Sequence, residues 1–139
     1  MRLPGWLLGL ALAAVGVESA QAYEPQTNYQ LQCMGCHTPD GSGEPGRVPS
    51  IKDTLVSFAR NPAGRRFLIQ VPGASQSTLS DAELAELLNW MIQNLSISKP
   101  TGFTRFTEAE VAGLRRTPLV DVQGTRRRLV RSLNSAAAH

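Results

Sequence analysis

The clearest pattern of apolar and polar positions in the chain runs from Leu79 to Leu95. Apolar residues there recur every three or four positions, which is the spacing of one face of an α-helix. They are Leu84, Leu87, Leu88, Met91 and Leu95, with Trp90 at the edge of the stripe. Ser80 and Glu83 are spaced as a capping box. The pattern predicts a helix that begins after Ser80 and a unit that ends at Lys99-Pro100.

Shorter helices are predicted upstream of this stripe. Pro25 suits the first turn of a helix, because it has no N–H to leave unpaired there, and that helix should extend to the Cys33 region. Residues 55–59 allow a short helix that closes before a proline, and residues 64–71 allow another that ends at a Val-Pro-Gly sequence. The glycines and prolines of residues 37–49 predict a loop.

Residues 100–139 carry two further amphipathic patterns. Thr107 and Glu110 have the spacing of a capping box, which predicts a helix from Glu108 to about Arg116. The next helix combines Leu119, Val122, Leu129, Val130 and Leu133 with Arg126, Arg127, Arg128 and Arg131. A basic amphipathic helix can bind an acidic partner or anionic lipid. We expect this one to pack on the preceding residues instead, with its arginines exposed to solvent.

The N-terminal residues 1–22 have the pattern of a secretory signal peptide. Arg2 precedes an apolar run from Leu7 to Val17, and Ala20-Gln21-Ala22 is a small-residue cleavage site. The mature chain should therefore begin at Tyr23 as a soluble protein of the periplasm. The alternative of an uncleaved membrane anchor is disfavoured because the apolar run is short for a membrane span.

Charge is distributed unevenly along the mature chain. Residues 23–99 contain six basic and seven acidic residues, whereas residues 100–139 contain seven basic and three acidic residues. The basic balance therefore belongs to the C-terminal part. Nucleic acid is not an expected partner, because the chain carries an export signal and no aromatic stacking surface accompanies the arginines.

Candidate chemistry is concentrated in the sequence Cys33-Met34-Gly35-Cys36-His37. Two cysteines separated by two residues and followed by a histidine form a c-type haem attachment motif. Each thiol adds across one vinyl group of the porphyrin, and the adjacent histidine supplies a neutral imidazole to the iron. The motif predicts one covalent haem c, bound through Cys33 and Cys36, with His37 as the proximal iron ligand.

Two other uses of a CxxCH sequence are less compatible with the rest of the chain. A zinc site needs further ligands, and the chain has no third cysteine and one other histidine, His139. A thiol-redox pair would be expected within a βαβ unit, which the apolar pattern does not predict.

Residues 23–99 resemble a class I cytochrome c. The resemblance rests on Tyr29 four positions before the first cysteine, the CxxCH motif, the Gly41/Gly43 loop and the segment Val48-Pro49-Ser50-Ile51. It implies an all-α, cytochrome c-like domain wrapped around one covalent haem. Residues 100–139 lie outside the resemblance and are expected to form a basic helical C-terminal extension.

The resemblance also implies roles for individual residues. The carbonyl of Pro49 should accept a hydrogen bond from the His37 imidazole, which would fix the tautomer of the ring. Trp90 should pack across the N-terminal helix near the haem edge. Tyr29 and Ile51 join Pro49 and Trp90 as the predicted haem-contacting residues.

The chain departs from this family at the sixth iron ligand. The family usually supplies a methionine from a loop upstream of its last helix, whereas residues 70–75 contain none and Val71 takes the expected place. The iron is then five-coordinate, or holds a weak ligand, or is reached by Met91. The weak candidates are Gln70, water, Lys52 and Lys99. Met91 lies on the apolar stripe, where a methionine is more often a core residue than a ligand.

Two functions are compatible with these expectations. We favour an electron-transfer protein rather than an enzyme, with periplasmic redox proteins as donor and acceptor. The alternative is a five-coordinate haem protein that binds a small ligand such as CO or NO at an open distal site. Efficient peroxide chemistry is not expected, because residues 64–77 contain no histidine, aspartate or glutamate that could exchange a proton there.

Overall fold

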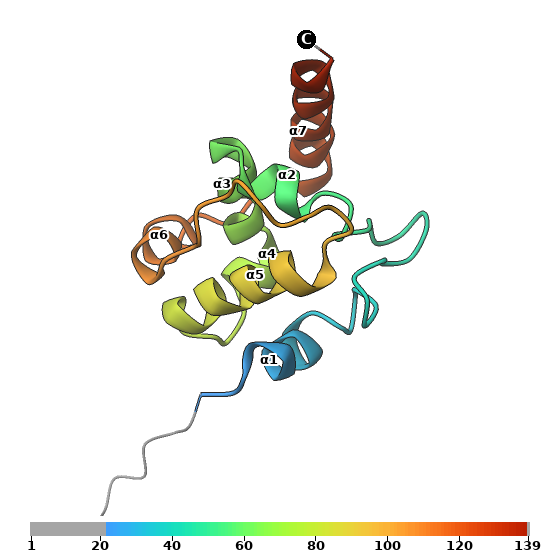
Figure 1. The fold of residues 1–139 in the computed structure, drawn as a ribbon. Coiled ribbons are helices and arrows are strands. Elements are labelled where there is room, and N and C mark those ends of the chain that lie inside the picture. Colours follow the sequence, from blue (N-terminus) through green and yellow to red (C-terminus); the bar gives the residue numbers. More distant parts are fainter. Residues whose placement is uncertain (1–21, 139) are drawn as a thin grey trace, which may run out of the picture.

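The computed structural model of the protein describes residues 22–138, and this part of the chain is helical (Figure 1). Its elements are α1 (Pro25–Gln32), α2 (Leu55–Ala59), α3 (Pro62–Gln70), α4 (Pro72–Ser75), α5 (Asp81–Leu95), α6 (Glu108–Leu114) and α7 (Val122–Ala137). The predicted all-α class is confirmed. The predicted signal peptide falls almost entirely outside the described residues. No helix within residues 22–138 is both long and apolar enough to cross a membrane.

Helix α5 lies at the centre of the fold and contacts α1, α2 and α6. Its capping box forms as predicted: Ser80 Oγ accepts a hydrogen bond from Glu83 N at 3.2 Å, and the Glu83 carboxylate accepts one from Ser80 N at 2.8 Å. The side chains that α5 buries are Leu84, Ala85, Leu87, Leu88, Asn89, Met91 and Ile92. The apolar stripe read from the sequence therefore faces the core.

Helix α1 packs on α5 through two aromatic rings. The ring centroids of Tyr29 and Trp90 are 5.7 Å apart, and the planes are tilted by 40°. The Tyr29 hydroxyl donates a hydrogen bond to the Thr38 carbonyl at 2.6 Å. Burial raises the pKa of Tyr29 to about 12, so the phenol keeps the proton that this hydrogen bond needs.

Helix α3 begins at Pro62, two residues before the predicted start at Gly64. The difference arises because Asn61 caps the helix: its Oδ1 accepts hydrogen bonds from Ala63 N and Gly64 N, and Pro62 suits the first helical position. A side chain on Gly64 would collide with the backbone of Phe58, so this glycine lets α2 and α3 approach closely.

The first part of the C-terminal extension belongs to the same core as α5. Phe106 is 2% exposed and Val111 is completely buried. The Asn89 side chain accepts a hydrogen bond from Phe106 N at 2.8 Å and donates one to Phe106 O at 3.0 Å. The first part of the extension therefore packs on the residues that precede it. The division of the chain at Lys99-Pro100 stays a prediction.

The predicted capping box of α6 forms only in part. Thr107 Oγ1 accepts a hydrogen bond from Glu110 N, but the Glu110 carboxylate pairs with Arg65, whose Nε lies 2.7 Å from Glu110 Oε1. The Arg65 guanidinium also lies over the Phe106 ring, 3.9 Å from its centroid. An arginine that is only 15% exposed is a stronger partner for a carboxylate than a backbone N–H, so the long-range contact replaces the local one.

Helix α7 extends away from the remainder of the fold at the top of Figure 1. Leu129 is its buried apolar side chain, while Arg127, Arg128 and Arg131 are exposed. The helix continues to Ala137. Its apolar residues as far as Leu133 pack against the core. Its first turns reach a cavity.

Candidate functional site

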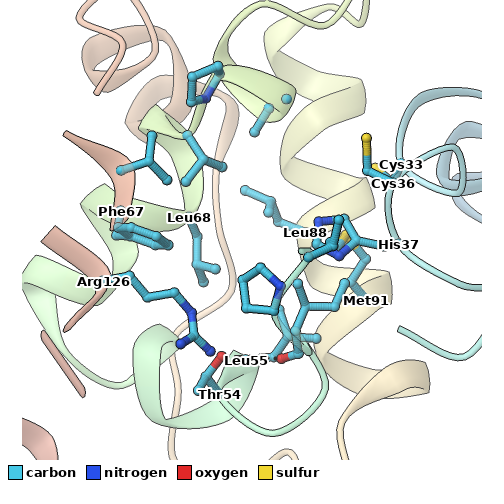
Figure 2. Close-up of a pocket in the computed structure, with 18 of the residues that line it drawn as sticks. Cys33, Cys36, His37, Thr54, Leu55, Phe67, Leu68, Leu88, Met91 and Arg126 are labelled. Carbon is cyan, nitrogen blue, oxygen red and sulfur yellow. Dashed lines mark hydrogen bonds between the residues drawn. The ribbon is translucent and has the colours of Figure 1, made fainter. Parts of the chain in front are cut away.

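A cavity of about 340 Å³ lies between α5, the α2–α4 segment and the start of α7. This volume is within the usual range for small-molecule and cofactor sites. Apolar residues dominate its walls: Val48, Pro49, Ile51, Leu55, Phe58, Phe67, Leu68, Val71, Leu84, Leu87, Leu88 and Met91. In the view of Figure 2, Cys33, Cys36 and His37 lie on one side, and Phe67, Leu68 and Arg126 lie on the other.

The CxxCH residues reach the cavity because α1 ends immediately before them. Cys33 N donates a hydrogen bond to Tyr29 O at 2.9 Å, and the chain then turns so that His37 N donates one to Cys33 O at 2.8 Å. This turn folds the five residues back on themselves and brings both cysteines and His37 to the lining. The three predicted haem-attachment residues therefore share one site.

Burial changes the acid–base properties of this cluster. It raises the pKa of the Cys33 thiol to about 11, with a further contribution from Cys36, and no disulfide joins the two cysteines. Burial also lowers the pKa of His37. The neutral imidazole that results is the form that binds a metal ion.

A glycine-dependent loop carries Pro49 and Ile51 to the cavity. Gly43 has a φ of 71°, and a Cβ on it would lie 2.9 Å from the Pro49 carbonyl oxygen and closer still to that of Val48. Ile51 N donates a hydrogen bond to Gly41 O at 3.0 Å, which closes the loop. The glycines named in the sequence pattern thus allow the backbone to pack against itself beside the cavity.

The hydrogen bond expected between His37 and Pro49 is not formed in the structure. His37 Nδ1 is buried and has no hydrogen-bond partner among the described residues. A buried polar atom without a partner is uncommon in proteins and often marks a functional group, which fits an imidazole held for a cofactor.

The candidates for a sixth iron ligand are placed very differently. Gln70 is buried, and its Nε2 donates a hydrogen bond to Leu114 O at 3.2 Å outside the cavity. Lys52 pairs with Asp40 at 2.6 Å, which holds the pKa of that carboxyl well below its usual range. Lys99 is exposed. Met91 lines the cavity, whereas Gln70, Lys52 and Lys99 do not.

Tyr29 and Trp90 do not line the cavity. They pack on each other between α1 and α5, so they support the helix that ends at Cys33. Their predicted contact with a haem edge stays a prediction.

Two arginines at the cavity were not anticipated from the sequence as site residues. Arg47 comes from the glycine-dependent loop, and Arg126 comes from α7, where its Nη2 donates a hydrogen bond to Ser50 O at 3.3 Å. The sequence pattern placed Arg126 among solvent-exposed arginines, because nothing local distinguishes it from Arg127 or Arg128. Its position next to Val122 and Gln123, which also line the cavity, comes from the docking of α7.

Comparison with known proteins agrees with this geometry. Two relatives from Thermus thermophilus, both named cytochrome c-552, are each 31% identical to this chain. One alignment spans 83% of this chain and 84% of the relative, and the other spans 66% and 85%. No protein-family model matches the chain. The chain belongs to the family of c-type cytochromes.

The residues at the cavity fit the haem that this family implies. One side presents two thiols and an imidazole, and the walls present an apolar surface for a porphyrin. Arg126 presents positive charge for carboxylates, as does Arg47, whose guanidinium also pairs with Glu44 at 2.9 Å. Among the described residues, no group of three or more histidine, cysteine or acidic side chains is arranged to hold a bare metal ion. Haem is therefore the cofactor that the site accommodates.

Proposed function

We propose that the protein is an exported c-type cytochrome that carries one covalent haem and transfers single electrons between redox proteins of the periplasm. The observation that carries this proposal is the cavity in which Cys33, Cys36 and His37 meet an apolar wall built by α3 and α5. The similarity to the cytochromes c-552 supports it along most of the chain.

Each residue of the CxxCH motif has a defined task in this proposal. Cys33 and Cys36 would hold the haem through thioether bonds, and His37 would bind the iron from one face. The lowered pKa of His37 keeps its imidazole neutral near pH 7, so its lone pair is available to the metal. When bound, the haem supplies one-electron exchange at its iron.

The walls and the rim of the cavity would tune this exchange. Leu68, Leu87 and Leu88 exclude water from the site, which favours the less charged ferrous iron. Arg47 and Arg126 would pair with the carboxylates of the porphyrin and reduce the cost of holding them beside an apolar surface. Loss of the Arg126 charge should therefore change the reduction potential.

The identity of the sixth ligand separates electron transfer from the alternative of small-ligand binding. Our expectation remains an iron without a strong methionine ligand, because Val71 lines the cavity and carries no lone pair. The ferrous protein should then bind carbon monoxide at neutral pH. Met91 is the competing candidate, since it also lines the cavity.

The proposal is tested by mass spectrometry of the denatured mature protein together with a redox titration. We expect the mass of one haem to remain on a chain that begins at Tyr23, and a reversible one-electron transition. The Cys36→Ala variant should keep at most one weaker linkage. A chain that releases its haem into acidified organic solvent would contradict covalent attachment.

A further inference from the structure

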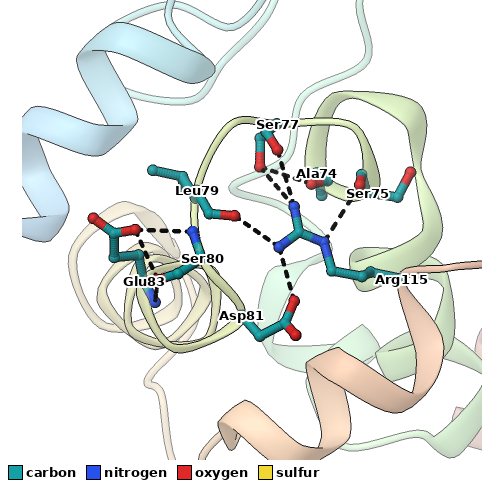
Figure 3. Close-up of polar contacts among 8 residues, drawn as sticks. All are labelled: Ala74, Ser75, Ser77, Leu79, Ser80, Asp81, Glu83 and Arg115. Carbon is teal, nitrogen blue, oxygen red and sulfur yellow. Dashed lines mark hydrogen bonds and ion pairs between the residues drawn. The ribbon is translucent and has the colours of Figure 1, made fainter.

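Arg115 connects the C-terminal extension to the segment that joins α4 and α5 (Figure 3). It directly follows α6, and its guanidinium donates hydrogen bonds to Leu79 O at 2.8 Å, Asp81 Oδ1 at 2.9 Å and Ser77 O at 3.0 Å. A longer contact of 3.4 Å reaches Ser75 O. One side chain thus binds four residues of a single turn segment.

The environment of Arg115 makes these contacts strong. Its side chain is 13% exposed and that of Asp81 is 29% exposed, so water screens the pair only weakly. The planar guanidinium offers five N–H donors in a fixed arrangement, which suits several acceptors at once. Lysine has the same charge, but its three donors are on one nitrogen, so it cannot bind all of these acceptor oxygens at once.

The segment that Arg115 binds has little packing of its own. Leu79 is the one buried residue between Val71 and Ser80, and the single turn of α4 buries none. Segments with few buried apolar contacts open easily unless other interactions hold them. Besides one hydrogen bond from Gln32 Nε2 to Thr78 Oγ1 at 3.2 Å, the long-range hydrogen bonds between side chains and residues 75–81 come from Arg115.

The same segment forms part of the cavity wall. Residues Val71, Pro72, Gly73, Ala74 and Ser77 all line the cavity, on elements other than the one that carries the CxxCH motif. A shift of residues 75–81 would move this wall directly, because Ser77 belongs both to that segment and to the cavity lining.

We propose that Arg115 is a positioning residue. It holds closed the cavity wall formed by residues 71–77, here called the distal wall, and thereby limits the access of external ligands to the iron. The inference rests on the proposed function, because it assumes a haem in the cavity. It assigns the C-terminal extension a part in the site through a residue that does not touch the cavity itself.

The test is the binding of imidazole to the ferric holoprotein at about pH 8.5, where free imidazole is neutral. A neutral probe is chosen because its approach does not respond to the loss of one positive charge. Replacing Arg115 by methionine should raise the rate constant for binding at least about tenfold, since several charge-assisted hydrogen bonds are lost. Amide hydrogen exchange of residues 75–81 should accelerate in the same variant.

Arg105→Met is the matched control. Arg105 is also a C-terminal arginine in an ion pair, at 2.8 Å from Glu86, but both side chains are more than half exposed and lie away from the cavity. This variant should bind imidazole at the wild-type rate. Arg115→Lys, which keeps the charge and is expected to fold, should fall between the wild type and Arg115→Met.

The inference would be overturned if the wild type and both Arg115 variants bound imidazole at the same rate and showed the same amide hydrogen exchange in residues 75–81. This holds even if the variants unfold at a lower temperature. The absence of imidazole binding in all of them would also overturn it. Failure of the proposed function is distinguishable, because it would appear first as a mature protein without covalent haem.

Discussion

The two sides of the cavity are built in different ways. The side that carries Cys33, Cys36 and His37 is formed by residues close in sequence, with the loop up to Ile51 completing it through short-range hydrogen bonds. The wall formed by residues 71–77 instead receives hydrogen bonds from Arg115, which lies some forty positions further along the chain. The start of α7 closes the same cavity from still further away.

This difference separates attachment from access. The CxxCH side holds the groups that would bind the haem, and its geometry follows from one turn after α1. The distal wall supplies little chemistry, but in our proposal its placement decides what can approach the iron. A chain assembled in this way can change its distal wall without disturbing the attachment site.

The variant with the largest expected effect is His37→Ala, which alters the CxxCH side of the cavity. We expect this change to abolish normal maturation or to leave an unstable iron site with an exchangeable ligand, because His37 is the one imidazole at the cavity among the described residues. The optical spectrum of the purified variant checks this. A wild-type spectrum would show that another residue binds the iron.

Val71→Met alters the distal wall while leaving the attachment side intact. Val71 lines the cavity, so a methionine there should offer a thioether to the iron. The variant should gain the absorption band of histidine–methionine ligation, resist carbon monoxide and have a higher reduction potential than the wild type. An unchanged spectrum would mean that the wall does not lie opposite His37.

Met91→Leu is the companion variant. It keeps the volume of a buried side chain of α5 that is 8% exposed but removes the sulfur. If Met91 is a core residue, the spectrum should stay unchanged. A wild-type protein that shows histidine–methionine ligation and loses it in this variant would make Met91 the sixth ligand.

The sequence predicted the parts of this molecule that depend on neighbouring residues. The spacing of Ser80 and Glu83 identified the start of α5, and residues 55–59 matched the bounds of α2, because caps and prolines act within a few positions. The residues of the CxxCH motif meet at the cavity for the same reason. The motif's three functional side chains are brought together by a single turn.

The sequence did not reveal interactions between distant elements. Glu110 had the spacing of a capping box, yet its carboxylate binds Arg65, 45 positions earlier. Arg115 and Arg126 resembled other arginines of the basic tail, although one binds the distal segment and the other lines the cavity. Such pairs depend on how α6 and α7 dock, and that is set by burial of residues such as Phe106 rather than by local spacing.

Gly43→Ala tests whether the attachment side depends on the close approach of its loop. Alanine would meet both the left-handed backbone and the carbonyls of Val48 and Pro49, so we expect a loss of about 3 kcal/mol of unfolding free energy. Gly46→Ala is the control: its φ is 79°, but no atom lies within 4 Å of the added Cβ. It should cost roughly 1 kcal/mol, and denaturant unfolding of both variants measures the difference.

Ser80→Ala should have the smallest effect. It removes the N-cap of α5, within the segment of residues 75–81 that Arg115 binds. Loss of this cap should cost about 1 kcal/mol at pH 7. Hydrogen bonds from the backbone and side chain of Ser80 lower the pKa of Glu83 in the folded protein.

The Glu83 carboxylate therefore stabilises the fold fully above its unfolded pKa of about 4.3, and this contribution disappears as the pH falls through the lower folded value. Denaturant unfolding of the wild type and Glu83→Gln should show a stability gap at pH 7 that closes in strong acid. Glu108→Gln removes the same charge from the first turn of α6 and should cost less stability at pH 7, because no capping hydrogen bond of Glu108 is lost. A stability difference between the wild type and Glu83→Gln that persists in acid would mean that the glutamine disturbs α5 by another route. The capping box would then not be what fixes the start of α5 next to the segment that Arg115 binds.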